Sequence, residues 1–333
     1  MATHLSSPLI VDRQHFPINS LAAYGAEQRQ ACGGTMPEEV RQRLREIGDM
    51  FTPATIAATR EMLAPLALHP QAIGADVVRD LQYGADARQR LDIFHAPGNL
   101  SPRPVVVFVH GGGFALGDKG DADAPFYNNF GAWAVRAGFV GVTMTYRHAP
   151  AHVWPSGAVD VAAAVDWLAR NVAPYHGDHT AIVLVGQSAG AAHVAGYLAG
   201  HGGALAHPLA AVLMSGIYEP DRFARNPMHE VYFGVDRALY PRRSTVLPLA
   251  ATDVPCLFTI SEFDPAQFQQ QLAAVFAART ALCGKCPEVL YLPGQNHVSP
   301  AMQLGSAVDP AGEHLADYVR RSYAAHGRRH QEI

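Results

Sequence analysis

From residue 76 onward, segments with the apolar pattern of strands alternate with segments that have the pattern of helices. The expected strands are Val77–Tyr83, Arg90–His95, Val105–Val109, Phe139–Thr145, Ala181–Val185, Leu209–Ser215, Cys256–Ser261 and Val289–Leu292. The expected helices are Pro125–Ala137, Gly157–Arg170, Ala189–Ala199, Pro265–Leu282 and Ala307–Ala324. This alternation predicts an α/β fold, with a mostly parallel sheet covered by helices on both faces. The first two strands, joined by Gly84-Ala85-Asp86, favour an antiparallel start.

The pattern divides the chain into two unequal parts. Residues 1–75 are expected to form an irregular arm and two short helices, because prolines at positions 37 and 53 follow Thr35 and Thr52 as helix-start signals. Residues 76–330 are expected to form one domain. Within this domain, the apolar residues of 218–250 have no clear helical or strand spacing, and the segment is expected to be an irregular insertion at the rim of the domain.

Charge and hydropathy exclude two classes of protein. The chain of 333 residues has a net charge of −4 and no block of like charge, which excludes a general nucleic-acid binder. Apolar runs such as Phe139–Tyr146 are far shorter than a membrane span requires. Residues 1–20 lack the pattern of a signal peptide. We therefore expect a cytoplasmic protein without a membrane span.

Cys283 and Cys286 form a C-x-x-C sequence, but its position does not favour redox or metal chemistry. A thioredoxin-like motif opens a helix after a strand, whereas this one follows an expected helix and precedes a strand. A zinc site needs a second ligand pair at a suitable spacing, which the chain lacks. We interpret the pair as ordinary cysteines at a helix–strand turn and expect no metal and no cofactor.

The sequence Gly186-Gln187-Ser188-Ala189-Gly190 is the strongest chemical signal. It lies between a buried strand ending at Val185 and an expected helix, and this context is typical of a serine nucleophile on a sharp strand-to-helix turn. Glycines two residues either side of Ser188 allow strand and helix to approach closely. We predict Ser188 as a nucleophile.

A serine nucleophile needs a base, and a histidine base needs an acid. His297 follows the strand ending at Leu292 through a polar turn, at the carboxyl edge where α/β folds collect ligands. Asp264 follows the strand ending at Ser261 and lies before a helix. Two alternatives remain open: Asp264 as a helix cap, and Glu262 as the acid. His193 is expected to be a packed helix residue rather than the base.

The sequence His110-Gly111-Gly112-Gly113-Phe114 directly follows the strand Val105–Val109. Three glycines allow successive N–H groups to point into one hollow, as an oxyanion hole requires. We predict donors from this glycine run and from Ala189, the residue after the nucleophile. A phosphate-binding loop is disfavoured because Lys119 comes too late after the glycines.

These motifs resemble those of α/β-hydrolases of the hormone-sensitive-lipase type, which include bacterial carboxylesterases and arylacetamide-deacetylase-like enzymes. The resemblance also rests on Tyr146–Pro150, Trp154-Pro155, Asp160 and Asp264-Pro265. It implies an α/β-hydrolase fold and the roles given above for Ser188, His297 and Asp264. It also implies oxyanion donors from Gly112, Gly113 and Ala189, and a helical N-terminal cap over the site. It implies a small-molecule ester substrate, and many such relatives form homodimers.

Four positions depart from the family pattern. Gln187 stands where an acidic residue is common, and Ala191 where a further glycine is common. His148 and Ala151 stand where the family's Tyr-Arg-Leu-Ala-Pro-Glu stretch has leucine and glutamate. Gln187 and Ala191 move the chain toward arylformamidase-like and feruloyl-esterase-like relatives that keep the same triad. The leading hypothesis is a serine carboxylesterase for short- to medium-chain or aryl esters. The alternatives are an amidase or arylformamidase, and a ligand receptor that does not turn its ligand over. Apolar substrate contacts are expected from Phe114, Leu116, Phe126 and Tyr218.

Overall fold

The computed structural model describes residues 36–98, 101–203, 208–222 and 227–331. Its centre is an eight-stranded sheet with the order β1-β2-β4-β3-β5-β6-β7-β8. The strands are β1 (Asp76–Gln82), β2 (Arg90–His95), β3 (Arg103–Val109), β4 (Val140–Met144), β5 (Gly177–Gln187), β6 (Ala210–Met214), β7 (Cys256–Phe263) and β8 (Glu288–Asn296). β2 pairs antiparallel with both β1 and β4, and all other neighbours are parallel. The mostly parallel sheet and its antiparallel start are therefore confirmed.

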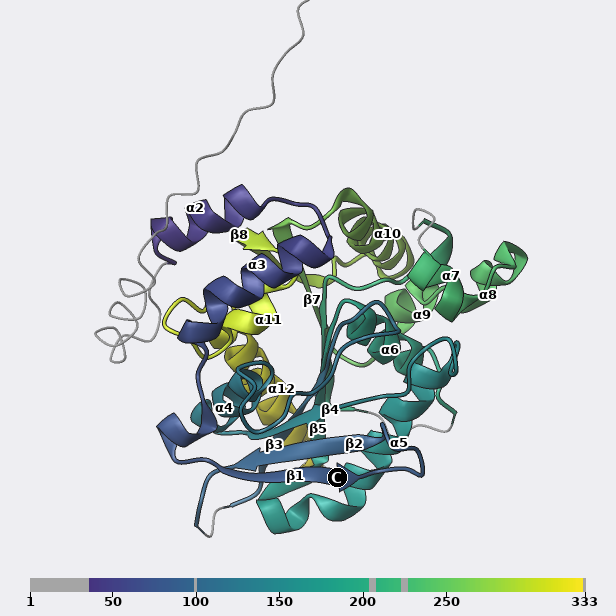
Figure 1. Cartoon of the computed structure of the whole chain (residues 1–333). Coiled ribbons are helices and arrows are strands. Elements are labelled where there is room, and N and C mark those ends of the chain that lie inside the picture. Colours follow the sequence, from purple (N-terminus) through teal and green to yellow (C-terminus); the bar gives the residue numbers. More distant parts are fainter. Residues whose placement is uncertain (1–35, 99–100, 204–207, 223–226, 332–333) are drawn as a thin grey trace, which may run out of the picture.

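Helices cover both faces of this sheet (Figure 1). They are α2 (Glu38–Ile47), α3 (Pro53–Leu63), α4 (Asn128–Arg136), α5 (Ser156–Asn171), α6 (Ala189–Leu198), α7 (Pro227–Phe233), α8 (Tyr240–Arg243), α9 (Val246–Ala251), α10 (Ala266–Cys283), α11 (Ser299–Gln303) and α12 (Gly312–Gln331). α5 and α6 contribute to the hydrophobic cluster on one face, and α4 and α12 to the cluster on the other.

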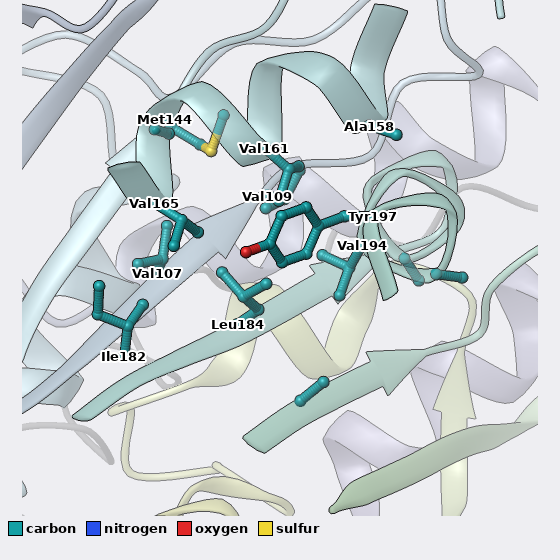
Figure 2. Close-up of a cluster of buried hydrophobic side chains, with 14 of the residues drawn as sticks. Val107, Val109, Met144, Ala158, Val161, Val165, Ile182, Leu184, Val194 and Tyr197 are labelled. Atoms are coloured by element: carbon teal, nitrogen blue, oxygen red, sulfur yellow. The ribbon is translucent and has the colours of Figure 1, made fainter. Parts of the chain in front are cut away.

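The central strands contain continuous apolar runs, Val105–Val109 in β3 and Ala181–Val185 in β5, because both of their faces are covered there. In β3, Val105, Val107 and Val109 join the cluster of α5 and α6, whereas Val106 and Phe108 join the cluster of α4 and α12. Figure 2 shows the first cluster, where the Leu184 side chain of β5 lies among valines and Tyr197. The two clusters hold β3 and β5 firmly, and the candidate site follows directly from the ends of these two strands.

The two N-terminal helices pack against the far end of the sheet. α2 contacts β8, and α3 contacts α11, so residues 38–63 lie beside the carboxyl end of β8 (Figure 1). Thr52 caps α3 by a capping box with Thr55. Pro37 occupies the cap position of α2, and the expected cap Thr35 and the arm before it lie outside the described residues. The division of the chain at residue 75 stays a prediction.

The structure corrects five expectations about elements. Residues 218–250 are not irregular, since their described part contains α7, α8 and α9. The expected polar turn Pro293–Asn296 is instead the end of β8. The short helix α11 was not predicted, and the last helix begins at Gly312 rather than Ala307. The expected helix at Pro125–Ala137 begins three residues later, at Asn128.

We predict that Leu184→Ala lowers the free energy of unfolding by about 2–5 kcal/mol, because Leu184 is fully buried and the shortened side chain leaves a cavity. The control is Leu247→Ala, at a leucine that is 69% exposed, which should change it by less than about 0.5 kcal/mol. Urea denaturation measures both. Equal shifts in the two variants would contradict the buried position of Leu184.

Candidate functional site

Ser188 lies at the turn between β5 and α6, in a strained backbone conformation. Its φ is 57° and its ψ is −117°, a combination that L-residues seldom adopt and that lifts the side chain away from the sheet. The flanking glycines are required by close backbone contacts. A Cβ on Gly190 would lie 1.9 Å from the Val109 oxygen, and one on Gly186 would lie 2.6 Å from the Ala191 Cα. The local structure predicted for this motif is thus present.

The structure brings Ser188, His297 and Asp264 into one hydrogen-bonded chain. The Ser188 Oγ lies 2.8 Å from His297 Nε2, and His297 Nδ1 lies 2.5 Å from Asp264 Oδ1. All three residues are at least 95% buried. They meet because β5, β7 and β8 are parallel, so the segments that follow these strands emerge at the same edge of the sheet.

Asp264 is held by two further hydrogen bonds. Its Oδ2 accepts the Ser215 hydroxyl at 2.6 Å and the Ser261 N–H at 2.7 Å. Glu262, the alternative acid, instead accepts the Gly294 N–H at 2.6 Å. Pro265, not Asp264, occupies the cap position of α10. The geometry therefore favours Asp264 over Glu262 as the partner of His297. Ser215 follows the end of β6, so the strand-edge argument used for Asp264 would also have found it.

The glycine loop after β3 lies beside Ser188. Gly112 and Gly113 have φ values of 134° and 59°, which favour glycine and bend the loop sharply. A Cβ on Gly112 would lie 2.0 Å from the Leu116 oxygen. In the described part of the chain, the N–H groups of Gly112, Gly113 and Ala189 have no hydrogen-bond acceptor. These three groups are therefore free to donate, and their role as an oxyanion hole stays a prediction.

Two phenylalanines enclose the His297 ring, and sequence patterns gave no sign of either contact. The Phe268 ring of α10 lies 4.0 Å from it, and the Phe51 ring, from the loop between α2 and α3, lies 4.5 Å from it. Gln187 also contributes, because its Nε2 donates to the His297 carbonyl at 3.0 Å. This bond connects the residue before the nucleophile to the backbone of the histidine.

A buried aromatic cluster supports the glycine loop from behind. The Phe114 ring stacks on Tyr232 of α7 at 4.4 Å and contacts His193 of α6 at 5.5 Å. His193 in turn contacts Tyr146, which also stacks on His110 at 4.4 Å. Burial lowers the pKa of His193 to about 3 and that of His110 to about 4. His193 is therefore a packed residue, as predicted, and both rings are neutral at pH 7.

The four expected apolar substrate contacts do not share one surface. Phe114 and Tyr218 are 2% exposed, and Phe126 is 3% exposed, whereas Leu116 is 62% exposed. Tyr218 packs edge-on against Phe258, and Phe126 joins the cluster formed by the N-terminal helices. Of the four, Leu116 offers the free surface that a substrate contact needs, and its role stays a prediction.

No set of three or more His, Cys, Asp or Glu residues in the described ranges has an arrangement that could hold a metal ion. Among the same residues, none of the helices is long and apolar enough to cross a membrane. Cys283 and Cys286 lie at the end of α10 and just beyond it, both with free and exposed thiols, at the helix–strand turn expected from the sequence.

Comparison with known proteins gives partial sequence matches to esterases. Residues 91–207 match the BD-FAE family. The carboxylesterase NlhH of Mycobacterium tuberculosis is 32% identical over 175 residues, which are 53% of this chain and 45% of that protein. The esterase LipQ of the same organism is 35% identical over 116 residues, 34% of this chain and 26% of that protein. The chain thus spans under half the length of these curated relatives.

Solved structures show the same fold over most of the chain. Esterase B from Lactobacillus Rhamnosis has a TM-score of 0.67 and 18% identity, covering 89% of this chain and 99% of that one. An esterase from the bacterial hormone-sensitive lipase family has a TM-score of 0.61 and 21% identity, covering 86% and 97%. The chain has the α/β-hydrolase fold, and its expected resemblance to esterases of the hormone-sensitive-lipase type is confirmed.

The buried histidines predict a loss of stability in acid. An unfolded histidine has a pKa near 6.5, so below that pH the unfolded chain binds protons that folded His193 and His110 do not. Their contribution to stability is therefore fully present above about pH 6.5 and is lost as the pH falls toward about 4. We expect His193→Asn to weaken this pH dependence by up to about 1.4 kcal/mol per pH unit.

Chemical denaturation at intervals from pH 7 to pH 4.5 measures this dependence. The matched control is His314→Asn, at an exposed position of α12, which should leave the slope as in the wild type. If the free energy of unfolding of His193→Asn fell with pH as steeply as that of the wild type, His193 would be protonated in the folded protein as well.

Proposed function

We propose that the protein is a serine hydrolase that cleaves carboxylic esters through an acyl-enzyme on Ser188. The observation that carries this proposal is the buried chain of hydrogen bonds from Ser188 through His297 to Asp264, next to three N–H groups without an acceptor among the described residues. The similarity to proteins named carboxylesterase and esterase supports the choice of esters.

The first half of the proposed reaction forms the acyl-enzyme. Nδ1–H of His297 donates to Asp264, which leaves Nε2 free to take the Ser188 proton. The Ser188 oxygen then attacks the ester carbonyl carbon. The negative charge that develops on the carbonyl oxygen is stabilised by the N–H groups of Gly112, Gly113 and Ala189. The imidazolium returns its proton to the leaving alcohol as the carbon–oxygen bond breaks.

In the second half, water replaces the alcohol. His297 takes a proton from water, the resulting hydroxide attacks the acyl carbon, and Ser188 leaves with the returned proton. Asp264 stabilises the imidazolium in both halves. The hydrogen bonds from Ser215 and from the Ser261 N–H fix the orientation of its carboxylate, so that the ring of His297 keeps one tautomer throughout.

The described part of residues 218–250 supports a role of this segment in substrate size. A Cβ on Gly113 would lie 2.9 Å from the Met228 Cε of α7, so the methionine side chain covers the loop beside the reacting atoms. Met228 is half-buried, and an unbranched methionine side chain adapts to ligands of different shape. We propose that Met228 limits the size of the substrate, in keeping with short- to medium-chain or aryl esters.

We predict that Ser188→Ala abolishes hydrolysis of p-nitrophenyl esters from acetate to decanoate, with kcat reduced by at least about 10³-fold. An alkyl phosphonate should add covalently to the wild type, and mass spectrometry should find the adduct on Ser188 and none in the variant. Full activity or labelling in Ser188→Ala would exclude this nucleophile. Activity on aryl formamides but not on esters would instead favour the amidase alternative.

We predict that Gly112→Ala reduces kcat by about 10²–10³-fold, because a Cβ at this positive φ would displace the loop and its N–H groups. Gly138→Ala is the matched control, since Gly138 also has a positive φ of 94° but has open space around it. Steady-state kinetics with p-nitrophenyl butyrate measure both variants. An unchanged kcat in Gly112→Ala would contradict the proposed oxyanion hole.

A further inference from the structure

The loop between α2 and α3 places one partly exposed aromatic ring against His297. Phe51 lies 4.5 Å from the imidazole, with 70° between the ring planes, and Phe268 lies 4.0 Å from it. The two phenylalanines differ in exposure, because Phe268 is 1% exposed and Phe51 is 36% exposed. Phe268 is therefore core packing, whereas Phe51 has free surface beside the histidine.

The geometry of ester cleavage determines which part of a substrate meets Phe51. Nε2 of His297 receives the Ser188 proton and must then deliver it to the leaving oxygen, so that oxygen has to lie within hydrogen-bond reach of Nε2. The alcohol part of the ester extends from the same oxygen. It therefore lies next to the imidazole ring, which the Phe51 ring also contacts.

The surroundings of Phe51 are mostly apolar. A small cavity of about 10 Å³ separates the loop from the ends of β7 and β8. Its lining includes the apolar side chains of Met50, Ile56, Phe263 and Val298, together with His297. Asp49 is the charged residue of this lining, and its carboxylate disfavours an alcohol group that carries an acid.

We propose that Phe51 forms the wall of the alcohol subsite, and that the substrates are esters of uncharged aromatic alcohols. This inference rests on the proposed ester hydrolysis at Ser188. An aromatic ring in the alcohol group can stack on Phe51 or meet it edge-on, which stabilises the complex beyond the burial of apolar surface alone. This extra stabilisation corresponds to an increase of about threefold to tenfold in kcat/KM. An alcohol as small as methanol does not reach the Phe51 ring and gains nothing from it.

The test compares two esters that share one acyl group, benzyl acetate and methyl acetate. Phe51→Ala should reduce kcat/KM for benzyl acetate about threefold to tenfold more than for methyl acetate. Phe51→Leu keeps an apolar side chain without an aromatic ring and should lose part of the preference for benzyl acetate over methyl acetate. Phe51→Tyr keeps the ring and should keep this preference. The ratio of the two esters cancels any common loss that comes from a displaced His297 or from reduced folding.

Phe276→Ala is the matched control, because Phe276 is 40% exposed and lies on α10 eight residues beyond Phe268. It should leave the ratio of the two esters as in the wild type. If Phe51→Ala lowered kcat/KM equally for both esters, the proposal would be overturned, and the role of Phe51 would be to position the His297 ring. An unchanged ratio with unchanged rates would overturn it as well.

The failure of this inference is distinguishable from the failure of the proposed function. If the wild type hydrolyses neither ester and Ser188 takes up no phosphonate, the proposed function is wrong and the inference falls with it. If the wild type hydrolyses both esters and the phosphonate marks Ser188, but Phe51→Ala leaves their ratio unchanged, the assignment of Phe51 alone is wrong.

Discussion

The close approach of helix α6 to strand β3 behind Ser188 is the constraint on which the candidate site depends. Gly190 lies so near the Val109 carbonyl that any side chain would force the two elements apart. This approach brings the first N–H of α6, from Ala189, beside the glycine loop that follows β3. The same contact therefore sets the position of the nucleophile and of the groups that would stabilise its oxyanion.

The strained backbone at Ser188 is stable because rigid elements surround it. β5 is paired on both sides in the middle of the sheet, and its apolar residues pack into the two clusters that cover the sheet's faces. A conformation of this kind costs about 1–3 kcal/mol and persists where the surrounding structure over-determines it. The large buried core thus supports a strained turn that exposes one hydroxyl group.

Buried strands were predictable from the sequence, because a strand covered on both faces needs apolar residues at every position, as in Val105–Val109. The end of β8 was not. Pro293 and Gly294 usually end a strand. Among the described residues, however, β8 is the last strand of the sheet and pairs only with β7, so a missing N–H is tolerated there. The short helices α7, α8 and α9 were missed because a helical period cannot be recognised over one or two turns.

Ser188, Asp264 and His297 were predictable as a set, because each is a polar residue just after a strand of the same parallel sheet. Phe51 and Phe268 were not, since an aromatic residue in a sequence indicates burial but does not identify its partner. The contact of Phe51 with His297 depends on how α3 docks on the sheet. That docking includes a hydrogen bond of 2.8 Å from the Asn296 Nδ2 to the Thr59 hydroxyl.

Two segments outside the alternating pattern therefore flank the nucleophile. Phe51 lies against His297 on one side, and Met228 lies against Gly113 on the other. α7, which carries Met228, is anchored through Tyr232, whose ring stacks on Phe114 and whose hydroxyl accepts the Gly157 N–H at 3.3 Å. The anchors Phe114 and Tyr232 are buried, whereas Phe51 is 36% exposed and Met228 is half-buried. Under the two proposals, substitutions of Phe51 or Met228 change the preference among substrates, while Ser188, His297 and Asp264 remain in place as residues.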